Sequence, residues 1–385
     1  MNSGWTVLVL GGGVGGIVAA RSLRRRLSDR DRVVLIDRER RHAFAPSFLW
    51  LAVGEREPRA ITRPLDRLER HGIEVVAGEI EAIDPERKAV RVDGEELVGD
   101  AVVVSLGAAL EPDAVPGLAE GGHDLYTLAG ADRIRRELER FRSGRVVVLT
   151  ADPVYKCPAA PYEAAMLIHD RLRRRGLEGS APVAVYAAEP GPMGTAGPDV
   201  SAAVRTMVEE RGIEYHPEHR IEVVDAEARR LHFADGASTE YDLLVYVPPH
   251  RAPDVVRQSG LTDESGWVPV DPHTLATEAT GVYAIGDVTT IPIPSGKRLP
   301  KAGVFAHGQA EIVARNLAAE LRGGTPNAAF DGKGACFIET GGGRAGYGSG
   351  DFYASPAPRM RLRSPARWWH WGKVLFEKRW LRRWF

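Results

Sequence analysis

Two cysteines, Cys157 and Cys336, are the residues of this chain best suited to redox or nucleophilic chemistry. Lys156 precedes Cys157, and a helix is predicted from about Glu163. A cation and the positive end of a helix dipole would therefore both favour a thiolate and lower the pKa of Cys157. The alternative is that Cys157 is a small buried apolar residue, as most free cysteines are. The separation of the two cysteines matches neither zinc ligands nor a C-x-x-C dithiol, which excludes both of those sites.

A glycine-rich turn near the N-terminus has the spacing of a dinucleotide-binding loop. Three glycines give the pattern G-x-G-x-x-G: Gly11, Gly13 and Gly16. They lie between a predicted strand, 6–10, and a predicted helix, 17–27. The next strand ends at Asp37, 21 residues after the last glycine, where an acid can hold an adenosine ribose. The glycines alone could form a tight turn of another α/β protein, but together with the strand, the helix and the acid they predict a dinucleotide site.

The chain repeats one unit. Three segments recur at offsets of 140 to 142 residues: 72–74 at 212–214, 80–84 at 221–225, and 100–105 at 242–247. Each copy predicts a β-hairpin followed by a buried strand, which indicates two tandem dinucleotide-type domains. Strands at 145–149 and 183–187 and a helix at 163–175 complete the second unit. A strand at 281–285 then leads toward a helix at 302–321.

The turn that follows the first strand of the second unit differs from the N-terminal one. Residues 151–163 contain three prolines and no glycine. Glycines allow backbone amides to approach a pyrophosphate, whereas prolines stiffen a loop and remove donors. We therefore expect that NADH does not bind at this loop.

The C-terminal segment from Arg359 differs in composition from the rest of the chain. It holds nine basic residues against Glu377 alone, a net charge of +8, so the first 358 residues carry −9 of the total of −1. It also holds five of the eight tryptophans. Split at Glu377-Lys378, the tail predicts two short amphipathic helices, of the kind that lie in the interface of an anionic bilayer leaflet. The alternatives are that the aromatic residues form a core or dimer contact, or that the tail binds nucleic acid, which no recognised binding module supports.

The overall composition suits a globular chain of more than one domain, with 385 residues, 44% hydrophobic and 27% charged. No stretch reaches the roughly 18 apolar residues of a membrane-spanning helix. The first predicted strand begins a few residues after Met1, so we expect no secretory signal.

Three parts of the chain resemble the flavin contacts of the two-dinucleotide-domain flavoprotein disulfide reductases. They are the glycines at 11–13, the strand at 101–107, and the Gly286-Asp287 turn. The resemblance covers nearly the whole chain and implies FAD as cofactor. Asp287 would then reach the ribityl and phosphate oxygens, and Gly107 would let the backbone pass close to the flavin. The helix that begins after Lys301 would point its dipole at the flavin ring.

Two cysteine motifs narrow this resemblance to the sulfide:quinone oxidoreductases and the flavoprotein subunit of flavocytochrome c sulfide dehydrogenases. The motifs are Lys156-Cys157-Pro158-x-x-Pro161-Tyr162-Glu163 and the Cys336 strand. The resemblance implies that Cys336 is the flavin-proximal thiol and that Cys157 holds the growing persulfide. Many members have a third cysteine that helps to hold the flavin or links it covalently. This chain has none, so its FAD should be non-covalent. Glu163 and His307 are candidate acid or base residues, although Glu163 could instead stabilise its helix and His307 could face away.

The sequence therefore predicts an α/β fold with two tandem Rossmann-like domains and a short C-terminal region with amphipathic membrane-binding helices. The expected division is 1–110 and 266–325 for FAD, 111–265 for the degenerate second Rossmann-like domain, and 326–385 for the C-terminal region. The resemblance implies sulfide and quinone as substrates, with the quinone near the Lys301 to Gln309 segment. The composition of the tail predicts peripheral attachment to an anionic membrane surface, and we expect this at the cytoplasmic face. A homo-oligomer remains open, and no nucleic acid is expected.

Three other functions remain open at this stage. A type II NADH:quinone dehydrogenase shares the fold and the tail, and reduction of the flavin by NADH would favour it. A periplasmic sulfide dehydrogenase subunit with a haem partner would need an export signal. A non-catalytic flavin-containing sensor of sulfide or persulfide would be bleached by sulfide without reoxidation by quinone.

Overall fold

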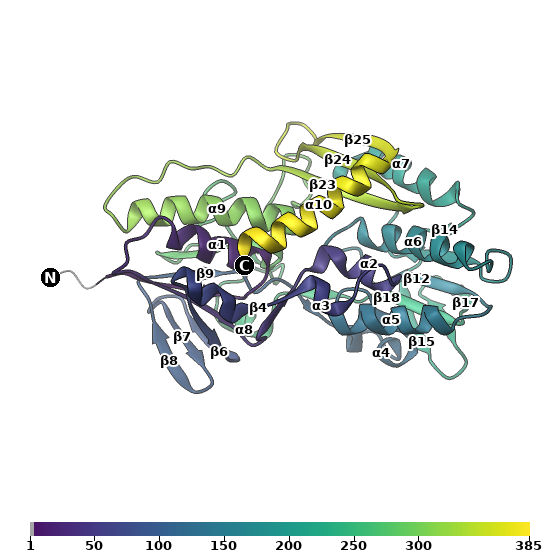
Figure 1. Cartoon of the computed structure of the whole chain (residues 1–385), viewed down its shortest axis with the longest axis horizontal. Helices are drawn as coiled ribbons and strands as arrows, with labels where there is room; N and C mark the ends of the chain where they lie inside the picture. The colour runs from purple at the N-terminus through teal and green to yellow at the C-terminus, as the bar shows by residue number, and fades with distance from the viewer. Residues whose placement is uncertain (1–3) are drawn as a thin grey trace.

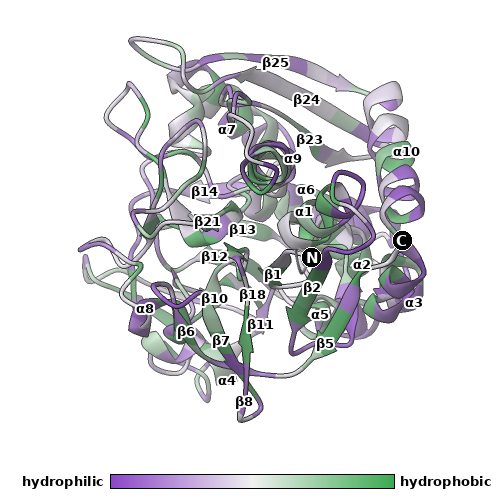
Figure 2. Cartoon of the chain, turned by 90° about the vertical axis from the view of Figure 1, so that its left-hand side faces the viewer, coloured by the Kyte–Doolittle hydropathy of each residue, from purple (hydrophilic) through white to green (hydrophobic). Residues whose placement is uncertain are grey.

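Two parallel five-stranded sheets form the centre of the molecule (Figure 1). The structure is a computed structural model and describes residues 4–385. The first sheet has the order β21 (Val282–Ala284), β9 (Ala101–Val104), β1 (Thr6–Leu10), β2 (Arg32–Asp37), β5 (Glu74–Ala77). The second has the order β11 (His123–Asp124), β18 (Leu243–Val247), β12 (Val146–Thr150), β13 (Val183–Ala187), β14 (Glu214–His216). The inner strands read as continuous apolar runs because helices cover both faces of a parallel sheet (Figure 2).

Two of the helices over these sheets, α1 (Val14–Arg24) and α6 (Ala160–Arg174), begin slightly earlier than the sequence predicts, whereas α9 (Gly303–Glu320) begins close to its predicted start. In the first sheet's layer, α1 packs on α9. In the second, α6 includes Pro161 in its first turn, where a proline is tolerated because the amide there has no partner in the helix. The three prolines therefore lie before α6 or in its first turn, and the helix begins before Glu163.

The repeat is visible as two three-stranded antiparallel sheets of the same design. One contains β6 (Ile80–Asp84), β7 (Ala89–Val92) and β8 (Glu95–Val98); the other contains β15 (Ile221–Asp225), β16 (Arg230–Phe233) and β17 (Ser238–Glu240). The register shifts at equivalent points, between Ile80 and Ala82 and between Ile221 and Val223. These observations confirm the α/β fold with two copies of one unit, while the predicted domain boundaries stay a prediction.

The other helices and strands complete and connect these units. The remaining helical segments are η1 (Ala45–Ser47), α2 (Phe48–Ala52), α3 (Pro58–Ile61), η2 (Leu65–His71), η3 (Pro112–Ala114), α4 (Leu118–Gly121), α5 (Leu128–Arg140), η4 (Gly194–Ala196), α7 (Pro198–Glu209), α8 (Asp254–Gln258) and η5 (Gly286–Val288). The remaining short strands are β3 (Arg41–Ala43), β4 (Thr62–Pro64), β10 (Ala109–Leu110), β19 (His250–Arg251), β20 (Val268–Pro269) and β22 (Thr289–Thr290).

The C-terminal region is an antiparallel sheet followed by a helix. Strands β23 (Lys333–Gly341), β24 (Arg344–Asp351) and β25 (Arg359–Ala366) pair in order, and β23 lies against α6. Helix α10 (Arg367–Trp384) then crosses from this sheet to α1, so that the C-terminus lies near the first domain's helices (Figures 1 and 2). Two segments far apart in sequence, α6 and α10, thereby enclose β23.

The expected break of the tail into two helices is wrong, because α10 is one continuous helix. Glu377, the predicted break point, is buried and forms an ion pair of 2.9 Å with Arg56. It also accepts a 2.6 Å hydrogen bond from the Ser47 hydroxyl. These contacts hold the middle of α10 against the rest of the protein. Glu377 is therefore not a solvated charge at which the helix could bend.

The two halves of α10 use their apolar faces differently. Four apolar residues near its end are buried: Trp380, Leu381, Trp384 and Phe385. The Trp380 ring lies 4.9 Å from Phe44 and 5.1 Å from His42. The alternative that these aromatic residues form a core is therefore correct for the C-terminal half. Four apolar residues in the first half are instead exposed: Trp368, Trp371, Leu375 and Phe376.

This difference predicts opposite effects for two tryptophan substitutions. Trp384→Ala should lower the free energy of unfolding by about 3–5 kcal/mol, because it removes a large side chain that is 1% exposed. Trp368→Ala, at a side chain that is 68% exposed, should change it by less than about 0.5 kcal/mol. Urea unfolding of the flavin-loaded protein measures both, and equal effects would contradict the packing of α10 described here.

Candidate active site

The glycine turn between β1 and α1 has the close approach that a dinucleotide loop needs. Gly11 has φ +99°, and a Cβ there would lie 2.6 Å from the Ser105 carbonyl oxygen. A Cβ at Gly16 would lie 1.8 Å from the Gly11 carbonyl oxygen. At Gly13 a Cβ would meet no atom within 4 Å. Gly11 and Gly16 are thus required by the packing of the turn, whereas Gly13 faces the open side from which a pyrophosphate approaches.

Asp37 lies at the end of β2, beside this turn, as the motif predicts. Its carboxylate accepts hydrogen bonds from the backbone amides of Gly12 and Glu39. Burial raises the pKa of Asp37, and these two amides lower it in part. The acid therefore holds the end of β2 against the glycine turn while keeping lone pairs for a ribose hydroxyl.

The Gly286-Asp287 turn carries an unsatisfied acceptor. The Oδ1 atom of Asp287 is buried and has no hydrogen-bond partner among the described residues. Burial raises the pKa of Asp287, while Lys156 and Lys301 lower it. Buried carboxylate oxygens are normally paired, so this atom fits a donor supplied by a bound group, such as a hydroxyl of the flavin ribityl chain. Gly107 has φ +68° and open space at its Cβ position, which leaves the backbone approachable.

Lys301 supports the same turn from behind. Its ammonium donates to the carbonyl oxygens of Asp287, at 2.7 Å, and Thr289, at 3.0 Å. It lies 3.3 Å from the centre of the Trp267 ring. Burial lowers the pKa of Lys301 to about 7. Gly286 donates its amide to Gln309 of α9 at 2.7 Å, so this turn and the start of α9 are fixed together. The residues present fit FAD.

Cys157 occupies an uncommon backbone conformation. Its φ is +51°, in the left-handed region that non-glycine residues rarely adopt. Three hydrogen bonds stabilise this strained backbone conformation. The Cys157 amide donates to the Lys301 carbonyl oxygen at 2.7 Å, and its own carbonyl oxygen accepts from the Ala160 amide and the Tyr126 hydroxyl. Such strain is common where a reactive side chain must be aimed, and here it ties Cys157 to the loop that ends at α9.

Both cysteines are free thiols, and their pKa values are high rather than low. Burial, together with the charge of Glu163, raises the pKa of Cys157 and of Cys336 to about 12. The charge of Cys336 also raises the pKa of Cys157. Cys157 lies just before α6, and Cys336 lies on β23, which packs against α6. The prediction that Lys156 and the helix end lower the pKa of Cys157 is therefore wrong. The Cys157 thiol reaches the surface on one side, but the atoms around it withhold most of the solvation that a thiolate needs.

The cation that stabilises a thiolate here comes from the tail. Lys373 of α10 lowers the pKa of both cysteines. Its ammonium forms a 2.8 Å ion pair with Glu163 of α6, and both side chains are almost completely buried. Burial lowers the pKa of Lys373, but Glu163 and Glu339 outweigh that effect and raise it. Lys373 therefore stays charged at neutral pH.

Glu339 and His370 extend this ion pair. The Glu339 amide donates to the Glu163 carboxylate at 2.8 Å, and this bond joins β23 to α6. The Glu339 carboxylate lies 3.0 Å from Nδ1 of His370 on α10. Three elements are thus connected through one buried polar cluster, consisting of Glu163, Glu339, His370 and Lys373. Sequence reasoning missed the last three, because only the fold brings them to Glu163.

His307 lies elsewhere. Its ring contacts Trp384 at 5.2 Å in an edge-to-face arrangement, and its Nε2 atom lies 3.9 Å from Glu311. Burial lowers the pKa of His307. These contacts are at the C-terminal end of α10, and the polar cluster at the thiols contains a different histidine, His370. An acid or base role for Glu163 or His307 stays a prediction.

The second Rossmann-type unit has its dinucleotide position occupied by its own side chains. Glu189, just after β13, is buried and accepts hydrogen bonds from Thr150, Tyr155 and Tyr162. Tyr155 belongs to the proline-containing loop and Tyr162 to the first turn of α6. An acid at this strand end would otherwise be free for a ribose hydroxyl. The loop lacks glycines, and the Glu189 carboxylate is already engaged in these three hydrogen bonds. Both features disfavour NADH binding at this position.

Two Rossmann-type units, one fitted for FAD, with one cysteine just before α6 of the other unit and one on the C-terminal strand that packs against α6, define a flavoprotein disulfide oxidoreductase. The chain belongs to the pyridine nucleotide-disulphide oxidoreductase family, which matches residues 5–310.

Individual relatives extend the similarity to the C-terminal region. The sulfide-quinone reductase of Aquifex aeolicus is 28% identical over 392 aligned positions, with 97% of this chain and 89% of the relative covered. The mitochondrial sulfide:quinone oxidoreductase of Mus musculus is 25% identical, with 91% and 79% covered. The solved structure of the Aquifex aeolicus enzyme superposes with a TM-score of 0.90 at 26% identity and covers 99% of this chain and 91% of that one.

The polar cluster predicts how the thiols respond to substitution. Glu163→Gln removes a negative charge that raises both thiol pKa values, so thiolate should form at a pH lower by about one unit. The rate of iodoacetamide alkylation of the reduced protein against pH measures this shift.

The matched control is Glu163→Gln with Lys373→Met, which removes both members of the ion pair and should leave the profile near that of the unmodified protein. A shift of the Glu163→Gln profile to higher pH would show that Glu163 does not oppose thiolate formation.

Proposed function

We propose that the protein is a sulfide:quinone oxidoreductase that binds FAD without a covalent link and works through Cys157 and Cys336. The observation that carries the proposal is that Cys157, just before α6, and Cys336, on β23, come from two elements that pack together although they are 179 residues apart in sequence. The buried Lys373, paired with Glu163 of α6, lowers the pKa of both thiols. The similarity to enzymes of this name over nearly the whole chain supports it. No third cysteine is available for a covalent flavin link of the kind the resemblance describes.

The proposed reaction starts from a Cys157–Cys336 disulfide. Hydrosulfide attacks the Cys157 sulfur, a new S–S bond forms, and the bond between the two cysteines breaks. Cys157 then carries a persulfide, and Cys336 leaves as a thiolate with the electron pair. Sulfide is oxidised to the sulfane level while the disulfide is reduced, so atoms and electrons balance. The bound flavin would supply the chemistry that accepts these two electrons and passes them to quinone.

The polar cluster has a defined part in this step. The thiolate leaving from Cys336 is poorly solvated, and burial together with the charge of Glu163 raises its pKa to about 12. Lys373 provides the positive charge that opposes this effect, and Glu163 holds the ammonium at 2.8 Å. Lys373 therefore acts on the leaving group, while the left-handed backbone at Cys157 aims the attacked sulfur.

The quinone belongs, in this proposal, at the start of α9. Gly303 and Val304 are exposed there, next to Lys301, which holds the Asp287 turn. An exposed apolar side chain such as that of Val304 suits contact with a hydrophobic ring. This placement supports transfer from the same flavin that the Gly286-Asp287 turn would hold.

The function predicts that both cysteines are indispensable. Cys157→Ser and Cys336→Ser should retain FAD but lose sulfide-dependent reduction of a short-chain quinone by at least about 1,000-fold, because a hydroxyl cannot form or leave a disulfide. Ala335→Ser, the neighbouring position on β23, is the matched control and should keep turnover. Near-normal turnover of either cysteine variant would eliminate the two-thiol reaction.

We further propose that the first half of α10 attaches the protein to a membrane surface. Within residues 4–385, the structure has no helix that is both long and apolar enough to cross a bilayer. The exposed residues Trp368, Trp371, Leu375 and Phe376 lie on one side of α10 and form what we call the aromatic patch. Tryptophan and phenylalanine on a helix rich in arginine suit the bilayer interface. Attachment at the cytoplasmic face, and a homo-oligomer, stay predictions.

If the aromatic patch contacts the membrane, negative charges introduced into it should weaken membrane binding. Trp371→Glu with Leu375→Glu should weaken binding to vesicles at least about 100-fold, because each apolar side chain contributes about 1.5–3 kcal/mol on burial. Val98→Glu, at another exposed apolar residue, on β8, is the control. Vesicle co-sedimentation measures the loss. Turnover with a soluble quinone should stay constant in both variants. Unchanged vesicle binding would show that α10 does not contact the membrane.

A further inference from the structure

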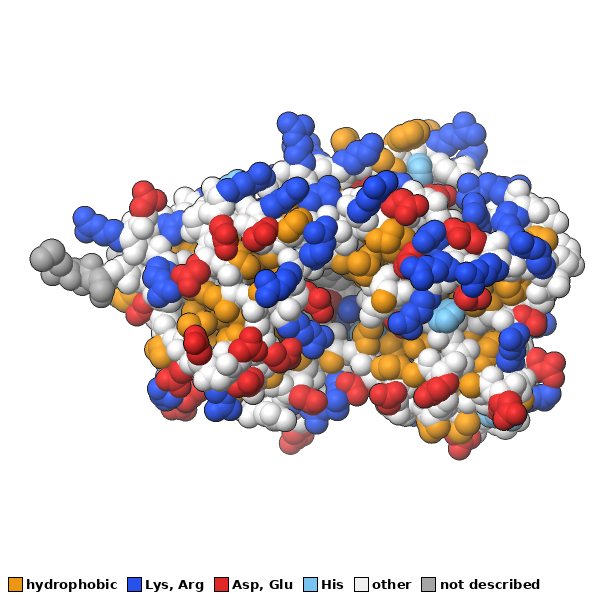
Figure 3. All heavy atoms as spheres, turned by 60° about the horizontal axis from the view of Figure 1, so that its bottom comes forward, with side chains coloured by type: hydrophobic (Ala, Val, Ile, Leu, Met, Phe, Trp, Pro, Cys, Tyr) orange, Lys and Arg blue, Asp and Glu red, His pale blue; other side chains and the backbone are white. Residues whose placement is uncertain are grey.

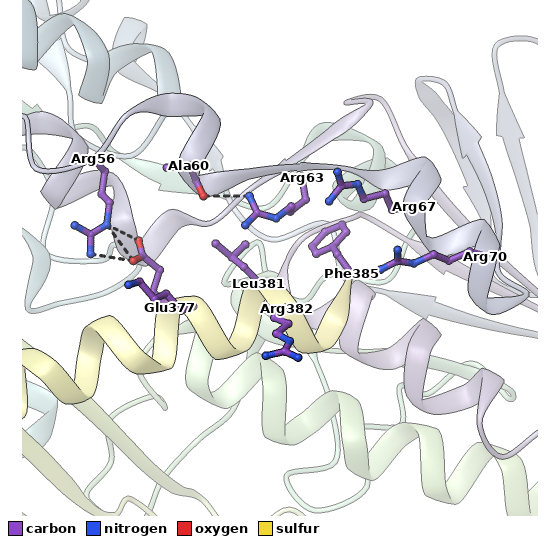
Figure 4. Close-up of a pocket in the computed structure, with 10 residues that line it drawn as sticks. Arg56, Ala60, Arg63, Arg67, Arg70, Glu377, Leu381, Arg382 and Phe385 are labelled. Carbon is purple, nitrogen blue, oxygen red and sulfur yellow. Dashed lines mark hydrogen bonds and ion pairs between the residues drawn. The ribbon is translucent and has the colours of Figure 1, made fainter.

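A basic pocket lies between the second half of α10 and the segment from α3 to η2 (Figure 4). Its volume is about 570 Å³. Six cations line it: Arg56, Arg63, Arg67, Arg70, Lys378 and Arg382. One acid, Glu377, also lines it, and Figure 4 shows this residue at one end, engaged with Arg56. None of the activities discussed above uses this pocket.

The charges of the pocket are not balanced by the protein. Glu377 neutralises Arg56, but within residues 4–385 no carboxylate forms an ion pair with any of the other five cations. Burial lowers the pKa of Arg63, and the positive charges of Arg67 and Arg41 lower it further, although the charge of Glu377 opposes this in part. Like charges held together in this way cost free energy unless an anion is bound between them.

Arg63 is also fixed in position. Its guanidinium donates to the carbonyl oxygens of Ala60, at 3.1 Å, and Thr62, at 2.7 Å. These bonds orient the side chain without removing its charge. A guanidinium that is already ordered loses little entropy when it binds a phosphate oxygen, and its remaining N–H groups suit two oxygens at once.

The pocket has an apolar side that a simple inorganic anion would not need. Leu381 and Phe385 line it and come from the same helix as Lys378 and Arg382. Leu375 and Phe376 of the aromatic patch precede Lys378 by less than one turn of α10. The ligand best matched by this arrangement is an amphiphile, with its anionic group among the arginines and its hydrocarbon along the exposed side of α10.

We propose that the basic pocket binds the phosphate headgroup of one anionic phospholipid. This inference rests on the membrane attachment proposed above and goes beyond it, because it replaces diffuse attraction of a basic tail by one saturable site. Figure 3 shows that Lys and Arg side chains are spread widely over the surface, particularly along the upper part of that view. If the pocket is a specific site, binding to anionic lipid depends on the arginines that line it. If only the general surface charge acts, any two surface arginines should matter equally.

The test compares two variants that lose the same charge at different places. Arg63→Gln with Arg67→Gln removes two pocket cations, and Arg359→Gln with Arg361→Gln removes two exposed cations of β25. The full flavin-loaded chain is titrated with phosphatidylcholine vesicles, with and without phosphatidylglycerol. The unmodified protein should prefer the anionic vesicles, and the pocket variant should lose about 10-fold or more of that preference, at about 1 kcal/mol per cation. The β25 variant should keep most of it. Equal losses in the two variants would overturn the pocket.

Two further measurements separate the remaining outcomes. Native mass spectrometry of detergent-solubilised protein should find one retained phosphatidylglycerol per chain, and fewer in Arg382→Gln. If millimolar inorganic phosphate alone abolishes that retention, the site is for a soluble anion and the lipid assignment is wrong. If the protein binds both kinds of vesicle equally, the pocket fails while the membrane attachment stands. If it binds neither, the attachment itself fails. Constant turnover with a soluble quinone shows that each variant is folded.

Discussion

The buried ion pair between Glu163 and Lys373 is the interaction on which the arrangement of the active site depends. It joins residues 210 apart, on α6 and α10, and Glu163 also accepts the backbone amide of Glu339 on β23. The Cys157 loop, the Cys336 strand and the tail are therefore fixed by one carboxylate. Burying two charges is costly, and removal of one partner of such a pair typically destabilises a protein by about 3–5 kcal/mol. Glu163 and Lys373 have opposite effects on both thiol pKa values. This indicates that the pair is kept because its charges act on the thiols.

Helix α10 consequently has three tasks along its length. Its inner face supplies Lys373 and His370 to the polar cluster, and its exposed aromatic patch faces away from the protein. Its C-terminal half reaches the glycine turn through His42, whose ring lies 5.1 Å from Trp380 and whose Nδ1 atom lies 2.9 Å from the Gly12 carbonyl oxygen. The tail is thus a wall of the candidate active site and a part of the core, and not an appendage that could be removed without loss of the fold.

Local sequence signals were sufficient for the elements that depend on local geometry. The glycines at 11, 13 and 16, the acid at 37 and the 141-residue repeat predict the two Rossmann-type units, because a tight turn and a hairpin bulge demand particular residues at particular spacings. The tail was predicted less well. Helical periodicity identifies an apolar face, but it cannot tell whether the folded protein covers that face. In α10 the apolar residues of the first half are exposed and those of the second half are buried. The raised thiol pKa values were missed for a related reason, since burial and the charge of Lys373 exist only in the folded chain.

The central claim is that the two thiols deliver electrons from sulfide, and not from NADH, to a flavin that quinone reoxidises. Anaerobic absorbance of the flavin at its visible maximum tests it most directly, with NADH, sulfide and a short-chain quinone added in that order. The account predicts no change with NADH, since Glu189 is committed to Thr150, Tyr155 and Tyr162, then bleaching with sulfide and recovery with quinone. Bleaching by NADH, with no response to sulfide, would contradict it.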